Sequence, residues 1–341
     1  MSNLIVRSAF FCTLTLVSCK SDAPDDTGGE SSLWSLMADN FSEGVLLSLW
    51  PSSDEEVLFV GGGMGREGPG ILARYRPLEN TLCWEELLDD KALWWVHGSD
   101  ETDWYAVGEK GAIVHYTASG GFQDESVETS RTLYGVWVDE GVVWAVGGSF
   151  GGSPTGTGEI WRKDETGWSL FAEDLPGTLF KVWEGLFVGN QVAYRLDADG
   201  SLEAIAPGEH KLLTLRGRSV TDVWAVGGTQ AADVMHFDGT AWTSVQTAGL
   251  SLPLMGVWTS PGESVWVSGM NGVQAYSDDD GVSWKIPDFP LTNNSFHAVR
   301  AVGDEVLFAG GNLMSTSGEF HGTIGRFGPS YEPPSLSKCS E

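Results

Sequence analysis

Val223-Trp224-Ala225-Val226-Gly227 is a nearly continuous apolar run that ends in glycine, and six more runs of this kind recur along the chain. The seven runs end at Gly61, Gly108, Gly147, Gly189, Gly227, Gly269 and Gly310. Neighbouring glycines lie 38 to 47 residues apart, the length that one small sheet of a radial repeat needs. An apolar run without alternation is typical of a strand covered on both faces. The repeat therefore predicts a closed ring of small sheets.

Each repeat unit carries four short apolar segments separated by turns. In one unit they are residues 252–258, 264–269, 272–276 and 284–286. The 341 residues include 45 glycines and 16 tryptophans, a composition suited to short strands and tight turns. We therefore predict an all-β fold, a single seven-bladed β-propeller over residues 33–331.

The seventh unit lacks a fourth strand of its own. After residues 322–327 comes Pro329, and prolines do not serve in central strands. Residues 33–38 match residues 168–172, the expected outer strand of the third unit. We therefore expect the N-terminal strand to complete the last blade and to cover its open edge.

The first residues are typical of an export signal that ends in a lipobox. An apolar stretch from Ala9 to Val17 is too short for a permanent bilayer span, and Leu16-Val17-Ser18-Cys19 follows the pattern of bacterial lipoproteins. This predicts a signal peptide at 1–18, a lipid on Cys19, an acidic flexible tether at 19–32 and a C-terminal tail at 332–341. An ordinary secretory signal is the alternative. No aspartate follows Cys19, which favours the bacterial outer membrane and leaves the side of that membrane open.

The acidic balance of the chain narrows its partners. A formal net charge of −28 repels phosphate backbones, so nucleic acid is excluded and membrane contact is expected through the N-terminal lipid only. In an oxidising compartment Cys83 and Cys339 form an even pair, and we expect a disulfide, with two free thiols as the alternative.

Residues 277–284, Ser-Asp-Asp-Asp-Gly-Val-Ser-Trp, fit the pattern Ser-x-Asp-x-Gly-x-Ser/Thr-Trp. The chain here resembles Asp-box (BNR-type) β-propellers, and especially exported bacterial lipoproteins built from Val-Trp-Ala-Val-Gly repeats. The likeness covers about residues 33 to 331. It implies a propeller in which the box is a turn device without chemistry. Sialidases also contain the box, but their arginine triad, tyrosine nucleophile and acid have no counterpart that we can place.

Other chemical motifs are weak. The run Gly147-Gly148-Ser149-Phe150-Gly151 matches a nucleophile elbow, but no helix can follow it. The six histidines show no metal-ligand spacing. Residues 197–200 and 278–280 could hold calcium, although acidic turns explain them better. We predict no cofactor and no metal.

Aligning the innermost strands places one residue of each unit in an equivalent position: Trp50, His97, Trp137, Trp183, Arg216, Trp258 and Arg300. These residue types dominate binding hot spots, so a ligand-binding ring near one mouth is predicted, with His97, Arg216 and Arg300 exposed. The alternative is that the seven side chains wedge between blades as core.

Three loops after the second strand are longer than the others, at residues 61–70, 147–158 and 310–322. If they emerge on one face, they form a cleft that carries Arg66, Phe150 and His321, because rigid scaffolds present function on loops. Flexible insertions without a role are the alternative.

These observations predict a non-catalytic monomer, anchored to the membrane, that binds or assembles with a protein or glycan partner at the cell envelope. The alternative is a propeller glycoside hydrolase or polysaccharide lyase, which needs paired carboxylates in a pocket. A purely structural surface protein is the third possibility. Two facing carboxylates at the channel mouth favour hydrolysis, and exposed Trp or Arg without them favours binding.

Overall fold

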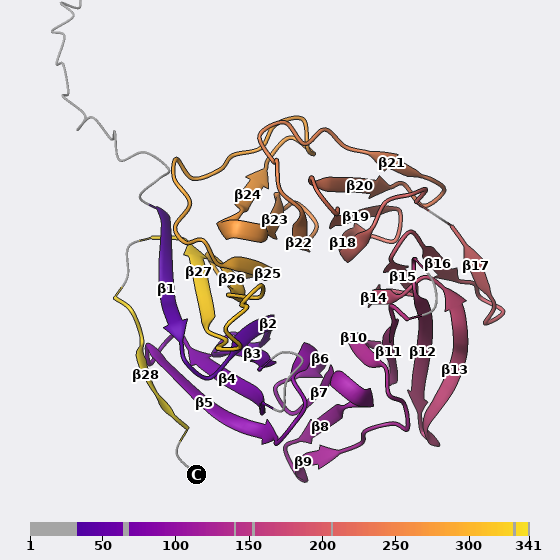
Figure 1. Ribbon diagram of the computed structural model, residues 1–341, viewed down its shortest axis with the longest axis horizontal. Helices are drawn as coiled ribbons and strands as arrows, with labels where there is room; N and C mark the ends of the chain where they lie inside the picture. The colour runs from indigo at the N-terminus through magenta and orange to yellow at the C-terminus, as the bar shows by residue number, and fades with distance from the viewer. Residues whose placement is uncertain are drawn as a thin grey trace, which may run out of the picture.

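The computed structural model describes residues 33–63, 68–139, 141–151, 154–205, 207–329 and 332–339. Its strands form seven small sheets around a central axis (Figure 1). The predicted all-β, seven-bladed propeller is confirmed. Within the described ranges, no helix has the length and apolar character that a bilayer crossing requires.

The blades follow one another along the chain, and each begins with its innermost strand. Blade 1 contains β2 (Val45–Ser53), β3 (Glu56–Gly62), β4 (Gly70–Arg76), β5 (Thr81–Leu88) and β28 (Ser335–Lys338). Blade 2 contains β6 (Leu93–Asp100), β7 (Asp103–Gly108), β8 (Ile113–Thr117) and β9 (Gly121–Asp124). Blade 3 contains β10 (Thr132–Asp139), β11 (Val142–Ser149), β12 (Thr157–Asp164) and β13 (Gly167–Pro176). Blade 4 contains β14 (Leu179–Trp183), β15 (Leu186–Gly189), β16 (Ala193–Leu196) and β17 (Leu202–Ala204).

The remaining blades complete the ring. Blade 5 contains β18 (Leu212–Ser219), β19 (Asp222–Gly227), β20 (Asp233–Phe237) and β21 (Trp242–Ser244). Blade 6 contains β22 (Leu254–Trp258), β23 (Val265–Gly269) and β24 (Gln274–Ser277). Blade 7 contains β25 (Ser295–Val302), β26 (Glu305–Gly311), β27 (Gly322–Phe327) and β1 (Trp34–Phe41). Two short 3-10 turns, η2 (Glu109–Gly111) and η3 (Met270–Gly272), follow β7 and β23.

The core of the described chain is divided among the interfaces between neighbouring blades. One apolar cluster joins Trp50 and Leu58 of blade 1 to Val96 and Trp104 of blade 2, and each of the other interfaces has a cluster of its own. Each blade thus buries both of its faces against its two neighbours. This explains why the second strands are apolar without alternation.

The glycine that ends each repeat run is required by a close backbone approach. A Cβ added to Gly227 would lie 1.9 Å from the carbonyl oxygen of Lys211, and the same clash, at 1.8 to 2.5 Å, arises at all seven equivalent glycines. None of the seven has a left-handed φ. Each repeat therefore requires glycine at this position, because the backbone at the start of the innermost strand lies too close to leave room for a side chain.

The N-terminal strand completes the last blade, as predicted. Strand β1 pairs antiparallel with β27, with Trp34 opposite Phe327. The buried Trp34 packs toward blade 6 against Trp266 and Phe308. Met37 and Phe41 pack toward blade 1. One strand therefore covers the edge of blade 7 and contacts both of its neighbours.

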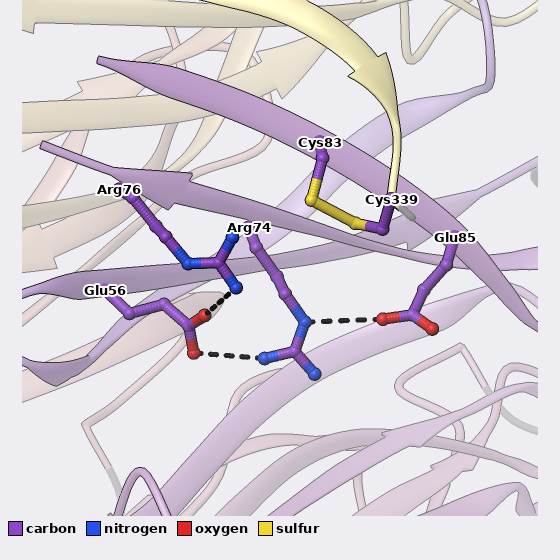
Figure 2. Close-up of a disulfide and its surroundings, with 6 residues drawn as sticks. All are labelled: Glu56, Arg74, Arg76, Cys83, Glu85 and Cys339. Carbon is purple, nitrogen blue, oxygen red and sulfur yellow. Dashed lines mark hydrogen bonds and ion pairs between the residues drawn. A yellow bond between two sulfur atoms is a disulfide. The ribbon is translucent and has the colours of Figure 1, made fainter. Parts of the chain in front are cut away.

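The C-terminal residues add a strand that the sequence did not predict. Strand β28 pairs in parallel with β5 and makes blade 1 five-stranded, and a disulfide joins Cys83 to Cys339 (Figure 2). Nearby, Arg74 contacts Glu56 at 3.0 Å and Glu85 at 3.3 Å. The expected cysteine pair thus fixes the chain end of blade 7 to the outer edge of blade 1.

Blade 6 differs from the expected four strands. In place of a strand at 284–286, a single bridge pairs Tyr276 with Lys285. The chain then meets Pro287 and Pro290, which have no N–H to extend a ladder. The fourth strand is therefore reduced to one residue pair.

We expect Gly227→Ala to lower the free energy of unfolding by more than about 3 kcal/mol, because the new methyl overlaps a backbone carbonyl that the blade cannot move freely. Denaturant titration followed by tryptophan fluorescence measures this loss. The control is Gly200→Ala, where φ is +84° and no atom lies within 4 Å of the added Cβ. It should cost about 1–2 kcal/mol, from φ strain alone. Equal losses in the two variants would contradict the close-approach explanation.

Candidate functional site

Every innermost strand contains a bulge directly after the residue that pairs with the repeat glycine. In blade 1, Leu46 pairs with Gly61 and Ser48 pairs with Val60, which leaves Leu47 as the extra residue. The same shift recurs in the other six blades. The seven extra residues are Leu47, Trp94, Tyr134, Phe180, Leu213, Met255 and His297. A bulge re-aims the side chain it carries, so these residues leave the blade interfaces.

The seven bulge residues together line one cavity of about 210 Å³ at a mouth of the central channel. We call it the cup. Phe150, from the long loop after β11, and Leu313 and Met314, from the long loop after β26, also line it, together with Lys181 and Lys211. The cup is therefore mostly apolar and aromatic and carries two amines. None of the described residues that line it carries a carboxylate.

Lys181 is the buried charge of the cup, only 4% exposed. Its Nζ donates to the carbonyl oxygen of Tyr134 at 2.6 Å and lies 4.0 Å from the centre of the Trp95 ring. No Asp or Glu of the described chain forms an ion pair with it, and burial lowers its pKa to about 7. At the rim, Lys211 faces the rings of Phe150 and Phe180. The amines thus sit among aromatic faces without acidic partners.

His297 contributes no positive charge to the cup. Its Nδ1 donates to the carbonyl oxygen of Leu47 at 2.5 Å, which leaves Nε2 as the acceptor. Burial, and then the charge of Lys181, lower its pKa to about 3. The imidazole is therefore neutral at physiological pH, and the lysines alone set the charge of the cup.

The ring predicted from the sequence lies three residues further along the same strands, at the waist of the channel. The waist is a cavity of about 30 Å³. Of the seven predicted residues it is lined by His97, Trp137, Trp183, Arg216, Trp258 and Arg300, whereas Trp50 lies in the interface between blades 1 and 2. The channel therefore narrows at this ring, and the mouth is formed by other residues.

The expected exposure of His97 is wrong. The imidazole is 6% exposed, stacks on Trp137 with 3.9 Å between ring centres, and accepts the backbone N–H of Val138 at Nδ1. Arg216 and Arg300 are half-buried at the waist. Packing against the next blade explains the difference, because a ring side chain at this position meets its neighbour before it meets solvent.

The predicted loop cleft is only partly formed by the expected residues. Phe150 lines the cup. His321 stands at the base of its loop, where its backbone N–H donates to Oδ1 of Asn312 at 2.7 Å, and it does not line the cup. Arg66 and Cys19 lie outside the described residues. Leu313, Met314 and Lys211 were not singled out from the sequence.

The alignment of the innermost strands did not identify the seven bulge residues, although it contains a signal for them. The alignment that selected Trp50 and its equivalents places the bulge residues three positions earlier, and these are apolar or aromatic in six units and histidine in the seventh. Apolar residues in an apolar strand do not reveal which of them a bulge turns toward the axis.

The acidic turns are held by their own hydrogen bonds. Asp279 accepts the backbone N–H of Ser283 at 2.8 Å and its hydroxyl at 2.6 Å, while the hydroxyl of Ser277 accepts the N–H of Gly281 at 2.8 Å. The two bonds from Ser283, and a third from the Ser277 hydroxyl at 2.8 Å, lower the pKa of Asp279 to about 2. Asp199 similarly accepts the N–H of Ser201 at 3.0 Å. Both aspartates act as turn caps.

The buried amine makes stability depend on pH. Because the pKa of Lys181 is about 7 when folded and near 10.5 otherwise, the unfolded chain binds more protons between these values. The free energy of unfolding should therefore rise with pH across this window. We expect the free energy of unfolding of the wild type to rise from pH 7 to pH 10 relative to that of Lys181→Met, as measured by denaturant titration. Lys285→Met is the control, because its amine is 45% exposed and pairs with Asp278, and it should show a smaller change across this window. If the free energy of unfolding of the wild type does not change with pH relative to that of Lys181→Met, the amine of Lys181 is not buried without an ion-pair partner.

Comparisons with known proteins identify similar folds but do not assign the chain to a family. No protein-family model matches the chain, and no curated protein matches it. YCF48 bound to D1 peptide is a similar solved structure, with a TM-score of 0.65, 15% identity, and coverage of 87% of this chain and 97% of that one. Virginiamycin B lyase from Staphylococcus aureus has a TM-score of 0.66 and 11% identity, and the match covers 86% of this chain and 99% of that one. The WD40 propeller domain of Doa1 has a TM-score of 0.62 at 12% identity over 87% and 97%. At these identities the likeness establishes the propeller architecture alone.

Proposed function

We propose that the protein is a non-catalytic binding module whose cup receives an exposed segment of a partner protein. The observation that carries the proposal is the closure of seven bulge residues into one apolar cup that contains Lys181 and no carboxylate. The segment that fits this cup presents an aromatic or aliphatic side chain beside an acidic group.

The apolar wall supplies the attraction for the side chain. Removing apolar surface from water stabilises a complex by about 25 cal/mol per Å², and the cup offers the rings of Trp94, Tyr134, Phe150 and Phe180 for this purpose. Phe150 and Met314 are 51% and 72% exposed, so a partner would cover them. Aromatic side chains and methionine are typical of interface cores.

The amines supply the selection for negative charge. The whole chain is strongly acidic, at −28, yet the cup contains Lys181 and Lys211 without an acid. A carboxylate that reaches Lys181 makes a charge-assisted hydrogen bond away from water, where such bonds are strong. The partner therefore provides the acidic group that the cup lacks.

The similar structures support a propeller that serves as a binding or an enzymatic module, and one of them holds a peptide. A hydrolase of polysaccharide needs two facing carboxylates, and neither the cup nor the waist has an Asp or Glu in its lining. The cup therefore supports binding of a protein segment better than glycoside hydrolysis.

Peptide binding to the full-length protein tests the proposal. Short fluorescent peptides with an aromatic residue beside Asp or Glu should bind saturably, and the matching Asn or Gln peptides about tenfold more weakly, since one charge-assisted bond is lost. Lys181→Met should lower the affinity for the acidic peptides about tenfold, so that they bind no more tightly than the matching Asn or Gln peptides. Phe150→Ser should weaken both kinds of peptide.

Phe289→Ser is the matched control, because Phe289 is 81% exposed and lies outside the cup. It should leave every affinity unchanged. Absence of saturable peptide binding, or the same affinities in Lys181→Met and wild type, would overturn the proposal. Saturable binding to an oligosaccharide series in place of the peptides would identify a glycan ligand.

We further propose that Cys19 anchors the protein by lipid at the bacterial outer membrane. The support is the sequence Leu16-Val17-Ser18-Cys19 after a short apolar stretch. Metabolic labelling with an alkyne fatty acid should mark the wild-type chain and leave Cys19→Ala unlabelled and outside the membrane fraction. Cys12→Ala is the control and should be labelled. Equal labelling of Cys19→Ala would contradict the anchor.

A further inference from the structure

The waist of the channel, below the cup, brings two arginines onto one tryptophan. The guanidinium carbon of Arg300 lies 4.4 Å from the centre of the Trp258 ring, and that of Arg216 lies 4.5 Å from it. Arg216 also lies 5.3 Å from Trp137 and 5.6 Å from Trp183. The aromatic faces hold the two cations close together by cation–π attraction.

Neither guanidinium forms an ion pair with an acid among the described residues that line the waist, and the charge of Glu184 acts on Arg216 from outside that lining. The Nε atoms of Arg216 and Arg300 are buried without a hydrogen-bond partner in the described chain. Burial lowers the pKa of Arg216 to about 10, against the charge of Glu184, and burial and the charge of Arg216 lower the pKa of Arg300. Two like charges that are partly buried on one aromatic ring, with no acid in the lining of their cavity, destabilise a fold.

Elsewhere the protein treats a buried arginine differently. Arg326 is 1% exposed, and its Nε donates to Glu305 at 2.9 Å, while its other nitrogens reach the same carboxylate and the carbonyl of Pro329. No Asp or Glu is among the described residues that line the waist. The contrast indicates that the counter-charge at the waist comes from outside the polypeptide.

The surrounding groups are also donors. His97 accepts the N–H of Val138 at Nδ1, so its proton resides on Nε2. The Nε1 atoms of Trp137 and Trp258 are buried without an acceptor. The waist therefore combines guanidinium, indole and imidazole N–H groups with no acid, a donor set that suits an anion.

The size of the waist limits the anion to a small one. Its cavity, about 30 Å³, has room for only two or three water-sized spheres, at about 10–15 Å³ each. A sugar, a nucleotide or a peptide carboxylate with its chain does not fit. We propose that the waist binds a single halide-sized anion, chloride in solution, between Arg216 and Arg300. This site is separate from the cup, and it does not depend on the proposed partner.

Bromide is the probe that tests the site, because it replaces chloride and quenches tryptophan fluorescence on contact. In the full-length protein, bromide titrated against gluconate at constant ionic strength should give a saturable quenching component, with an accompanying rise in the thermal midpoint. Arg300→Met and Arg216→Met should each lose the saturable component. Each variant removes one of two like charges, so both should fold, and anomalous diffraction from a bromide-soaked wild-type crystal gives an independent reading.

Arg195→Met is the matched control. This arginine pairs with Asp197 and Glu203 away from the waist, and its loss should leave the saturable component intact. The proposal is supported if the component is present in wild type and Arg195→Met and absent in the waist variants. It is overturned if quenching is linear in wild type, if the waist variants keep the component, or if no bromide peak lies between Arg216 and Arg300. Peptide binding at the cup is unaffected by either result.

Discussion

The contact of a glycine with the carbonyl of the crossing strand is the constraint on which the rest of this molecule depends. At Gly227 no Cβ could stand, because the carbonyl oxygen of Lys211 would lie 1.9 Å from it. The innermost strand is thereby brought so near the second strand that its next residue loses its place in the ladder. That residue becomes a bulge and points toward the axis. Repeated in seven blades, the same arrangement supplies the seven bulge side chains that line the cup.

The positive side chains buried along the axis of the ring destabilise the fold. No Asp or Glu among the described residues lines the cavities that hold Lys181, Arg216 and Arg300, and the two arginines share the ring of Trp258. A chain with 47 acidic residues could place one beside them, as it does beside Arg326. Positive charge without a paired acid is therefore concentrated along the axis of a strongly acidic chain.

The sequence predicted the ring well because its signals are periodic. The spacing of the repeat glycines showed seven units, and the likeness of residues 33–38 to 168–172 showed how the last unit is completed. The site was harder, because a bulge inserts one residue and changes which side chain faces the axis. Alignment therefore selected Trp258 and its equivalents at the waist and passed over Met255 and its equivalents in the cup.

Strand β28 shows a second limit of prediction from sequence. Ser335-Leu336-Ser337-Lys338 has neither a long apolar run nor a covered face, and prolines precede it. Its position is set from a distance, by the ladder with β5 and the bond between Cys83 and Cys339. Local patterns carry no trace of such a contact, although the even number of cysteines did indicate that the two ends of the ring meet.

Strands β1 and β28 both lie on the outer wall of the disc, on the adjoining blades 7 and 1 (Figure 1). The described part of the chain therefore begins and ends at the side of the ring. Neither strand contributes a residue to the cup or to the waist. A tether at either end of the described chain therefore attaches away from both cavities.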